Sequence, residues 1–161
     1  MADENDESPQ VEALQGQLGI QKIYVKDLSF EAPNSPGVFT EQLSPTLDLH
    51  FGNTTNALGN DLHEVVLAIT ATVKQADRTV YLVEVKQAGI FMLTGFPEEH
   101  LPAILATACP NVLLPFAREA ICDLVGKGGF PQLLIAPVNF DLLYAQELQR
   151  RQAAPATEIT H

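Results

Sequence analysis

The sequence contains no tryptophan, only two cysteines, and 9 basic against 20 acidic residues among its 161 positions. The scarcity of lysine and arginine argues against a nucleic acid or an anionic membrane as partner, because both recruit cationic surfaces. Neither Cys109 nor Cys122 belongs to a C-x-x-C pair, and no charged leader precedes them. No apolar run approaches the roughly 20 residues that a membrane helix needs. We therefore expect a cytoplasmic protein with reduced thiols and no direct membrane insertion.

Groupings typical of catalysis or metal binding are also missing. The histidines are scattered along the chain, and His63 with Glu64 does not form an H-E-x-x-H motif. The glycine-rich segment 126–130 lacks the Lys-Ser/Thr of a phosphate loop, and its glycines are typical of a helix end followed by a turn. The neighbours Glu98 and Glu99 would point about 100° apart on a helix, which is typical of a solvated first turn. We expect no enzyme, no metal site and no cofactor.

Composition divides the chain into one folded unit and two tails. Residues 1–19 carry five acidic side chains among Ser, Gln and Gly, and such a polar segment cannot bury enough apolar surface to become ordered. Residues 153–161 are short, rich in small residues and interrupted by proline. The sequence thus predicts a disordered acidic tail over 1–19, a folded domain over 20–152 and a flexible C-terminal tail over 153–161.

The first half of the domain has the alternation of β-strands. Strands are expected over residues 23–31, 46–51, 62–73 and 80–93, where apolar and polar side chains alternate. In the first of these, strict alternation places Tyr24, Lys26, Leu28 and Phe30 on one face and Ile23, Val25, Asp27, Ser29 and Glu31 on the other. Short connections between the later strands favour antiparallel pairing.

The second half has helical spacing. A short helical piece is expected over residues 97–108, and apolar side chains recur every three or four residues from Asn111 to Val125. Asn139 can cap a last helix that has Asp141 in its first turn. Strands followed by helices predict an α+β fold: a four-stranded antiparallel sheet with two main helices packed on one face.

Three segments of the chain resemble the SecB family of bacterial protein-export chaperones. They are CPNVLLPFAREAICDLVGKGGFPQLLIAPVNFD at 109–141, IYVKDLSFEAPNSP at 23–36 and EVKQAGIF at 84–91. The resemblance spans roughly residues 20–150. It implies a SecB-like domain that acts as an ATP-independent holdase: it would bind unfolded secretory preproteins and deliver them to the translocation ATPase SecA.

Two surfaces follow from this resemblance. The positions Asp27, Glu31, Leu82 and Glu84 match the flat acidic surface on which SecB proteins dock the basic, zinc-containing C-terminal tail of SecA. From the residues alone, this set is more typical of a solvated sheet edge with one exposed apolar residue. The second surface is a hydrophobic groove for clients, formed by the connection after the first strand, the Gly/Pro loop and the last helix. Its candidate residues are Phe39, Leu43, Phe130, Leu133, Leu134, Ile135, Val138, Phe140, Leu143 and Tyr144.

The groove residues have an alternative role, because loops of this kind can also close a sheet over its core. Many relatives carry tryptophan at the position of Leu43, so this chain departs from the family's aromatic groove. The resemblance also implies a homotetramer built as a dimer of dimers. The expected contacts lie on the long helix and on one face of the fourth strand: Tyr81, Val83, Val85, Gln87, Phe116, Ala120, Ile121 and Leu124.

Two alternative functions are considered beside export. A SecB-like chaperone dedicated to an antitoxin would keep the fold and change the client. A small-molecule-binding domain would need convergent polar groups around a cavity, and the sequence offers no obvious set.

Overall fold

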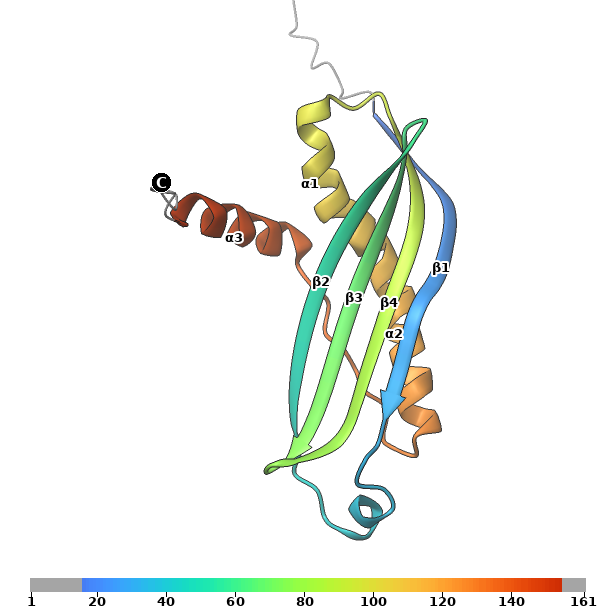
Figure 1. Ribbon diagram of the computed structural model, residues 1–161, viewed down its shortest axis with the longest axis vertical. Coiled ribbons are helices and arrows are strands. Elements are labelled where there is room, and N and C mark those ends of the chain that lie inside the picture. Colours follow the sequence, from blue (N-terminus) through green and yellow to red (C-terminus); the bar gives the residue numbers. More distant parts are fainter. Residues whose placement is uncertain (1–15, 155–161) are drawn as a thin grey trace, which may run out of the picture.

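The computed structural model describes residues 16–154, which form a single sheet with helices on one side (Figure 1). The strands are β1 (Gln17–Glu31), β2 (Thr46–Gly59), β3 (Leu62–Gln75) and β4 (Arg78–Thr94), and the helices are α1 (Leu101–Ala106), α2 (Ala108–Lys127) and α3 (Phe140–Ala153). Short 3-10 turns occur at Gly37–Thr40 and Glu98–His100. The strand order is β1-β4-β3-β2, and all neighbouring strands are antiparallel. The α+β class with a four-stranded antiparallel sheet is confirmed.

Most of the two predicted tails lies outside the described residues. The part of the first tail that is described contributes to the sheet, because β1 begins at Gln17. At the other end, α3 reaches Ala153, the first residue of the second tail.

Two-residue turns join the last three strands. Asn60 and Asp61 both have positive φ, 54° and 61°, and residues of these types tolerate that conformation at little cost. Such a turn matches the twist of a hairpin, and β2 accordingly pairs with β3 along its whole length. This pairing extends β2 to Gly59, past the expected end at residue 51.

Strand β1 departs from strict alternation. Its register with β4 shifts between Ile20 and Lys22 and again between Val25 and Asp27, so Lys26 has no direct partner. An extra residue in a bulge moves every later side chain to the opposite face. The predicted faces are confirmed within residues 27–31 but were wrong in joining them to residues 23–25, which precede the bulge. Val25 lies on the side of β4 Gln87 and Leu28 on the side of Val85, both facing the helices, whereas Asp27 faces away.

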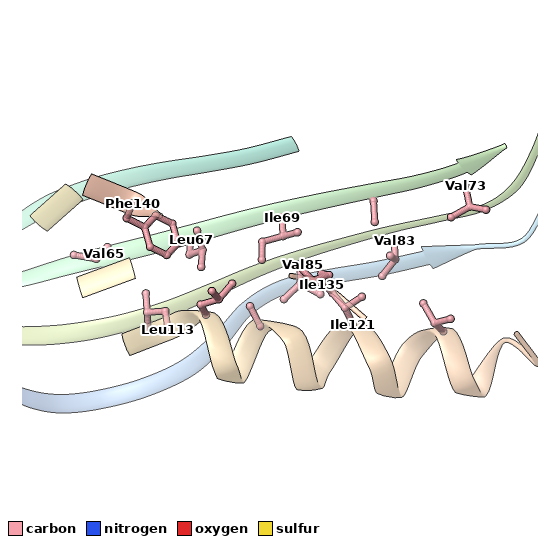
Figure 2. Packing of buried hydrophobic residues seen from close by; sticks show 14 of the residues in the cluster. Val65, Leu67, Ile69, Val73, Val83, Val85, Leu113, Ile121, Ile135 and Phe140 are labelled. Atoms are coloured by element: carbon pink, nitrogen blue, oxygen red, sulfur yellow. The ribbon is translucent and has the colours of Figure 1, made fainter. Parts of the chain in front are cut away.

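The core lies between α2 and the sheet face formed by β3 and β4 (Figure 2). Alternate residues of both strands are buried there, and α2 contributes the side chains that cover them. The labelled examples are Val65, Leu67, Ile69, Val73, Val83, Val85, Leu113 and Ile121. Full burial of each such side chain contributes about 1.5–3 kcal/mol. Gly89 allows the close approach, since a Cβ there would lie 3.0 Å from Leu113 Cδ2.

The long helix begins earlier than expected. Helix α2 starts at Ala108 and not at Asn111, and the expected piece over 97–108 is a 3-10 turn followed by α1. The whole stretch Glu98–Lys127 is long and apolar enough, by length and composition alone, to cross a membrane. The expectation that no such run exists was wrong. In this fold the stretch contains the core helix, which packs on β4.

Helix α3 extends away from the sheet and contacts α1 and α2 (Figure 1). As predicted, Asn139 caps it: the side-chain oxygen accepts a hydrogen bond from the Leu142 backbone N–H at 3.0 Å. Asp141 lies in its first turn and two arginines in its last, where their charges complement the helix dipole.

Candidate functional site

The sheet face opposite the helices, here called the outer face, brings together the four predicted docking residues. Residues directly opposite each other on antiparallel strands share a face. Glu31 lies opposite Leu82, and Ser29 lies opposite Glu84. Asp27 is two residues before Ser29, past the bulge, and therefore faces the same way. The set is contiguous over β1 and β4.

The carboxylates of this set are accessible. Asp27 and Glu31 are exposed, and Leu82 and Glu84 are half-buried. Among the described residues, no ion pair involves these three carboxylates, so their charge is available to a basic ligand. Lys86 lies opposite Asp27 and offsets part of that charge.

The outer face continues over β3 and β2. Thr72 lies opposite Leu82 on one side and opposite Asp48 on the other, so Asp48 belongs to the same row as Glu31. Its carboxylate is 3.1 Å from His50 Nε2. Sequence reasoning missed Asp48, although the alternation over 46–51 together with the hairpin register could have placed it.

A polar cluster formed by Tyr24, Lys26 and Glu64 crosses the middle of the outer face. The Tyr24 hydroxyl donates to one Glu64 carboxylate oxygen, and Lys26 Nζ donates to the other at 2.9 Å. These hydrogen bonds, that of Tyr24 first, hold the pKa of Glu64 below its ordinary value. Burial, with Glu64 as the smaller cause, raises the pKa of Tyr24 to about 12, so the phenol is a neutral donor. Strict alternation placed Tyr24 and Lys26 on one face, but the sequence did not show that Glu64 of β3, two strands away in the sheet, lies beside them.

The candidate groove residues fall into two groups by burial. Phe130, Ile135 and Phe140 are only 6–8% exposed and belong to the chain's own core. Other side chains of the same chain cover these three, and their contact with a client stays a prediction. The remaining seven are exposed or half-buried: Phe39, Leu43, Leu133, Leu134, Val138, Leu143 and Tyr144.

An aromatic cluster ties two of the candidate client segments together. The Phe130 ring lies 4.9 Å from Tyr81 and 5.1 Å from Phe39, measured between ring centroids. Phe30 from β1 completes the cluster, 6.3 Å from Phe130. The connection after β1 is thereby fixed to the loop that follows α2, with half of Phe39 still exposed.

The two cysteines contribute to packing, as expected. Cys109 is fully buried, and this burial raises the pKa of its thiol to about 12. The Cys122 thiol donates to the backbone oxygen of Leu133 at 3.0 Å and so fastens the loop after α2 to that helix.

Two open pockets occur in the part of the chain that the structure describes. The larger, about 520 Å³, lies between the first turns of α2 and α3 and includes Thr107, Asn111, Val138 and Asp141. The smaller, about 280 Å³, lies at the start of β1. Val138 and Phe140 of the predicted groove line the larger pocket, and none of the predicted groove residues lines the smaller one. In residues 16–154 there is also no group of three or more His, Cys, Asp or Glu that could hold a metal ion.

The expected subunit contacts differ in burial. Tyr81, Val83, Val85 and Gln87 are 0–5% exposed within the single chain, and Ile121 is fully buried. Side chains of the same chain cover these five, and their contact with a second subunit stays a prediction. The other three residues lie on the outer side of α2. Phe116 is 47% exposed, and Ala120 and Leu124 are half-buried.

Comparison with known proteins gives concordant matches. Residues 11–151 match the family described as preprotein translocase subunit SecB. The protein-export protein SecB of Nitrosococcus oceani is 53% identical over 161 residues, covering 99% of this chain and 98% of its own. That of Methylococcus capsulatus is 53% identical over 143 residues, covering 88% of this chain and 92% of its own.

A solved structure has a similar fold. It is the SecB-like chaperone of Mycobacterium tuberculosis in complex with a ChAD peptide from the HigA1 antitoxin, with a TM-score of 0.64 and 22% identity. The match covers 76% of this chain and 91% of that chain.

Proposed function

Because the chain belongs to the SecB family, a family of export chaperones and not of enzymes, we propose that it is an ATP-independent holdase of the cytoplasm. It captures unfolded secretory preproteins on exposed apolar surface and delivers them to SecA. SecA recognition uses the outer face, where the basic, zinc-containing C-terminal tail of SecA meets Asp27, Glu31, Leu82 and Glu84.

The observation that carries this proposal is the separation of two kinds of surface. The outer face presents carboxylates around a half-buried leucine, a pattern that suits a basic ligand with an apolar contact. The second surface consists of apolar side chains in the connections and on α3. In the connections, Leu134 is 78% and Phe39 50% exposed. Two surfaces let one particle hold a client and a delivery partner together.

The first experiment tests client capture. The protein is mixed at stoichiometric amounts with an unfolded preprotein, and the rate of preprotein refolding is measured. We expect Leu134→Ser to shorten the delay in preprotein refolding, since burial of one leucine against the client contributes about 1.5–3 kcal/mol to binding. Leu58→Ser is the matched control, because Leu58 is 45% exposed but lies in the β2–β3 hairpin. Failure of the unaltered protein to delay refolding would contradict the holdase proposal.

The second experiment separates docking from capture. Glu84→Lys reverses a charge on the outer face and should weaken binding of the zinc-loaded SecA tail, most strongly at low salt, where screening is least. The delay of preprotein refolding should be unchanged. Equal loss of both activities would contradict the assignment of two surfaces.

The proposal includes a homotetramer, a dimer of dimers. Only 28% of the most apolar window of Glu98–Lys127 is buried within one chain, and Phe116 is exposed on the outer side of α2. Several client sites on one particle would raise avidity by about 10²–10⁴ without new contacts. Light scattering tests this: a mass near the 17.5 kDa of one chain at working concentration would refute it.

A further inference from the structure

The display of Asp27 on the outer face depends on where β1 carries its extra residue. Ile23, before the bulge, and Phe30, after it, both face the helices, opposite Gly89 and Val83 of β4. These two positions are seven residues apart in sequence, and strict alternation would put them on opposite faces. One extra residue must therefore be absorbed between Ile23 and Phe30.

The position of that extra residue decides the direction of Asp27. With the bulge at Lys26, Asp27 follows it and lies on the outer face with Glu31. If the bulge lay at Ser29 instead, Ile23 and Phe30 would keep their burial and Glu31 its exposure, but Asp27 would turn toward the helices. Ile23 and Phe30 alone do not distinguish these two arrangements. Leu28 faces the helices with the bulge at Lys26 and would face outward with the bulge at Ser29, but it is a weak anchor because 44% of it is exposed.

Side chains of β3 and β4 contact β1 beside the bulge, one from each face of the sheet, and hold the bulge at Lys26. On the outer face, Glu64 of β3 accepts hydrogen bonds from Tyr24 and from Lys26, which is itself the unpaired residue. On the inner face, the Gln87 amide of β4 donates to the Tyr24 backbone oxygen at 3.1 Å. Gln87 is only 3% exposed, and this bond gives a buried amide a partner beside a disrupted ladder.

We propose that Glu64 and Gln87 are positioning residues that fix the β1 bulge at Lys26 and so place Asp27 beside Glu31 on the docking face. The placement of the bulge is a property of the sheet alone. Its effect on docking rests on the proposed recognition of SecA.

The docking test is a double-mutant cycle with a peptide of the zinc-loaded SecA tail as the probe. Asp27→Asn removes one exposed charge and should weaken binding roughly two- to fivefold, the range of a single exposed ion pair. Glu64→Ala should weaken binding by a similar factor. The double variant should be no weaker than either single variant, because a displaced Asp27 has no contact left to lose. Additive losses would overturn the proposal.

Two further variants guard against a general loss of structure. Glu64→Gln keeps an acceptor for the Tyr24 hydroxyl and should retain more binding than Glu64→Ala. Tyr24→Phe removes only the hydroxyl, so its affinity for the peptide should lie between those of Glu64→Ala and the unaltered protein. If Glu64→Ala, Glu64→Gln and Tyr24→Phe all bound the peptide as tightly as the unaltered protein does, the positioning role would be refuted.

A crystal structure of the Glu64→Ala variant tests the sheet independently of any ligand. We expect the unpaired residue to move from Lys26 toward Ser29, whereas a bulge that stays at Lys26 would overturn the proposal. The crystal structure also separates the proposal on SecA docking from the proposal on the position of the bulge. If the unaltered protein binds no tail peptide, the docking proposal fails, and the position of the bulge still decides the role of Glu64.

Discussion

Replacing Phe130 by alanine should be among the most damaging single changes in the loop after α2. The side chain is 8% exposed and lies against Tyr81, Phe39 and Phe30. Truncation of a buried phenylalanine costs about 3–5 kcal/mol, which includes the cavity left behind. Because domains of this size are stable by about 5–15 kcal/mol, the change removes a large share of the free energy of unfolding.

Urea unfolding at one fixed protein concentration measures the effect, since association would otherwise shift the midpoint. With an m-value of about 1–3 kcal/mol/M, the midpoint should fall by more than about 1 M. Leu134→Ala is the control in the same loop: its side chain is 78% exposed, so the change should stay within about 0.5 kcal/mol. A Phe130→Ala protein as stable as this control would refute the view that the aromatic cluster anchors the loop.

Three other changes test separate contacts. Asn139→Ala removes the cap of α3 and should destabilise that helix by about 1 kcal/mol, seen as a loss of helical circular dichroism on mild heating; an unchanged signal would contradict the cap. Gly89→Ala puts a methyl group against Leu113 and should lower unfolding free energy by about 1–3 kcal/mol; a stabilised protein would argue against the close approach of α2. The folded pKa of Glu64 lies below its ordinary value, so its stabilising effect is present above the unfolded pKa and lost as pH falls through the folded one. The stability advantage over Glu64→Gln should therefore be largest near neutral pH and shrink in acid, and an advantage that grew in acid would contradict this.

Alternation along the chain was a good guide to β3 and β4. Every second residue of β3 from Val65 to Val73 is apolar and buried, and both strands are paired on both sides, so the expected inner face and the register agree. Strict alternation failed in β1 because it ignored a change of phase: apolar residues occur at 23 and 25 and then at 28 and 30, so one extra residue lies between Val25 and Leu28. The pairing register with β4 places it at Lys26.

Alternation also identifies a face without identifying what covers it. The apolar side of β4 was expected to meet a second subunit, yet α2 of the same chain buries Val83 and Val85 completely. For the same reason Phe130 and Ile135 were counted among client contacts. Distinguishing a covered from an open apolar face requires knowledge of which segments meet in space, and the sequence pattern carries no such information.

The strand order has a consequence for the timing of assembly. Strands β2, β3 and β4 follow one another through two-residue turns and can pair as soon as each is complete. Strand β1 is synthesised first but has its only strand partner in β4, so it waits until the chain beyond residue 94 exists. Long-range pairing of this kind is slow compared with hairpin formation. Asp27 and Glu31 therefore meet Leu82 and Glu84 only after β4 is complete, and a partner that needs all four residues has no site on a shorter nascent chain.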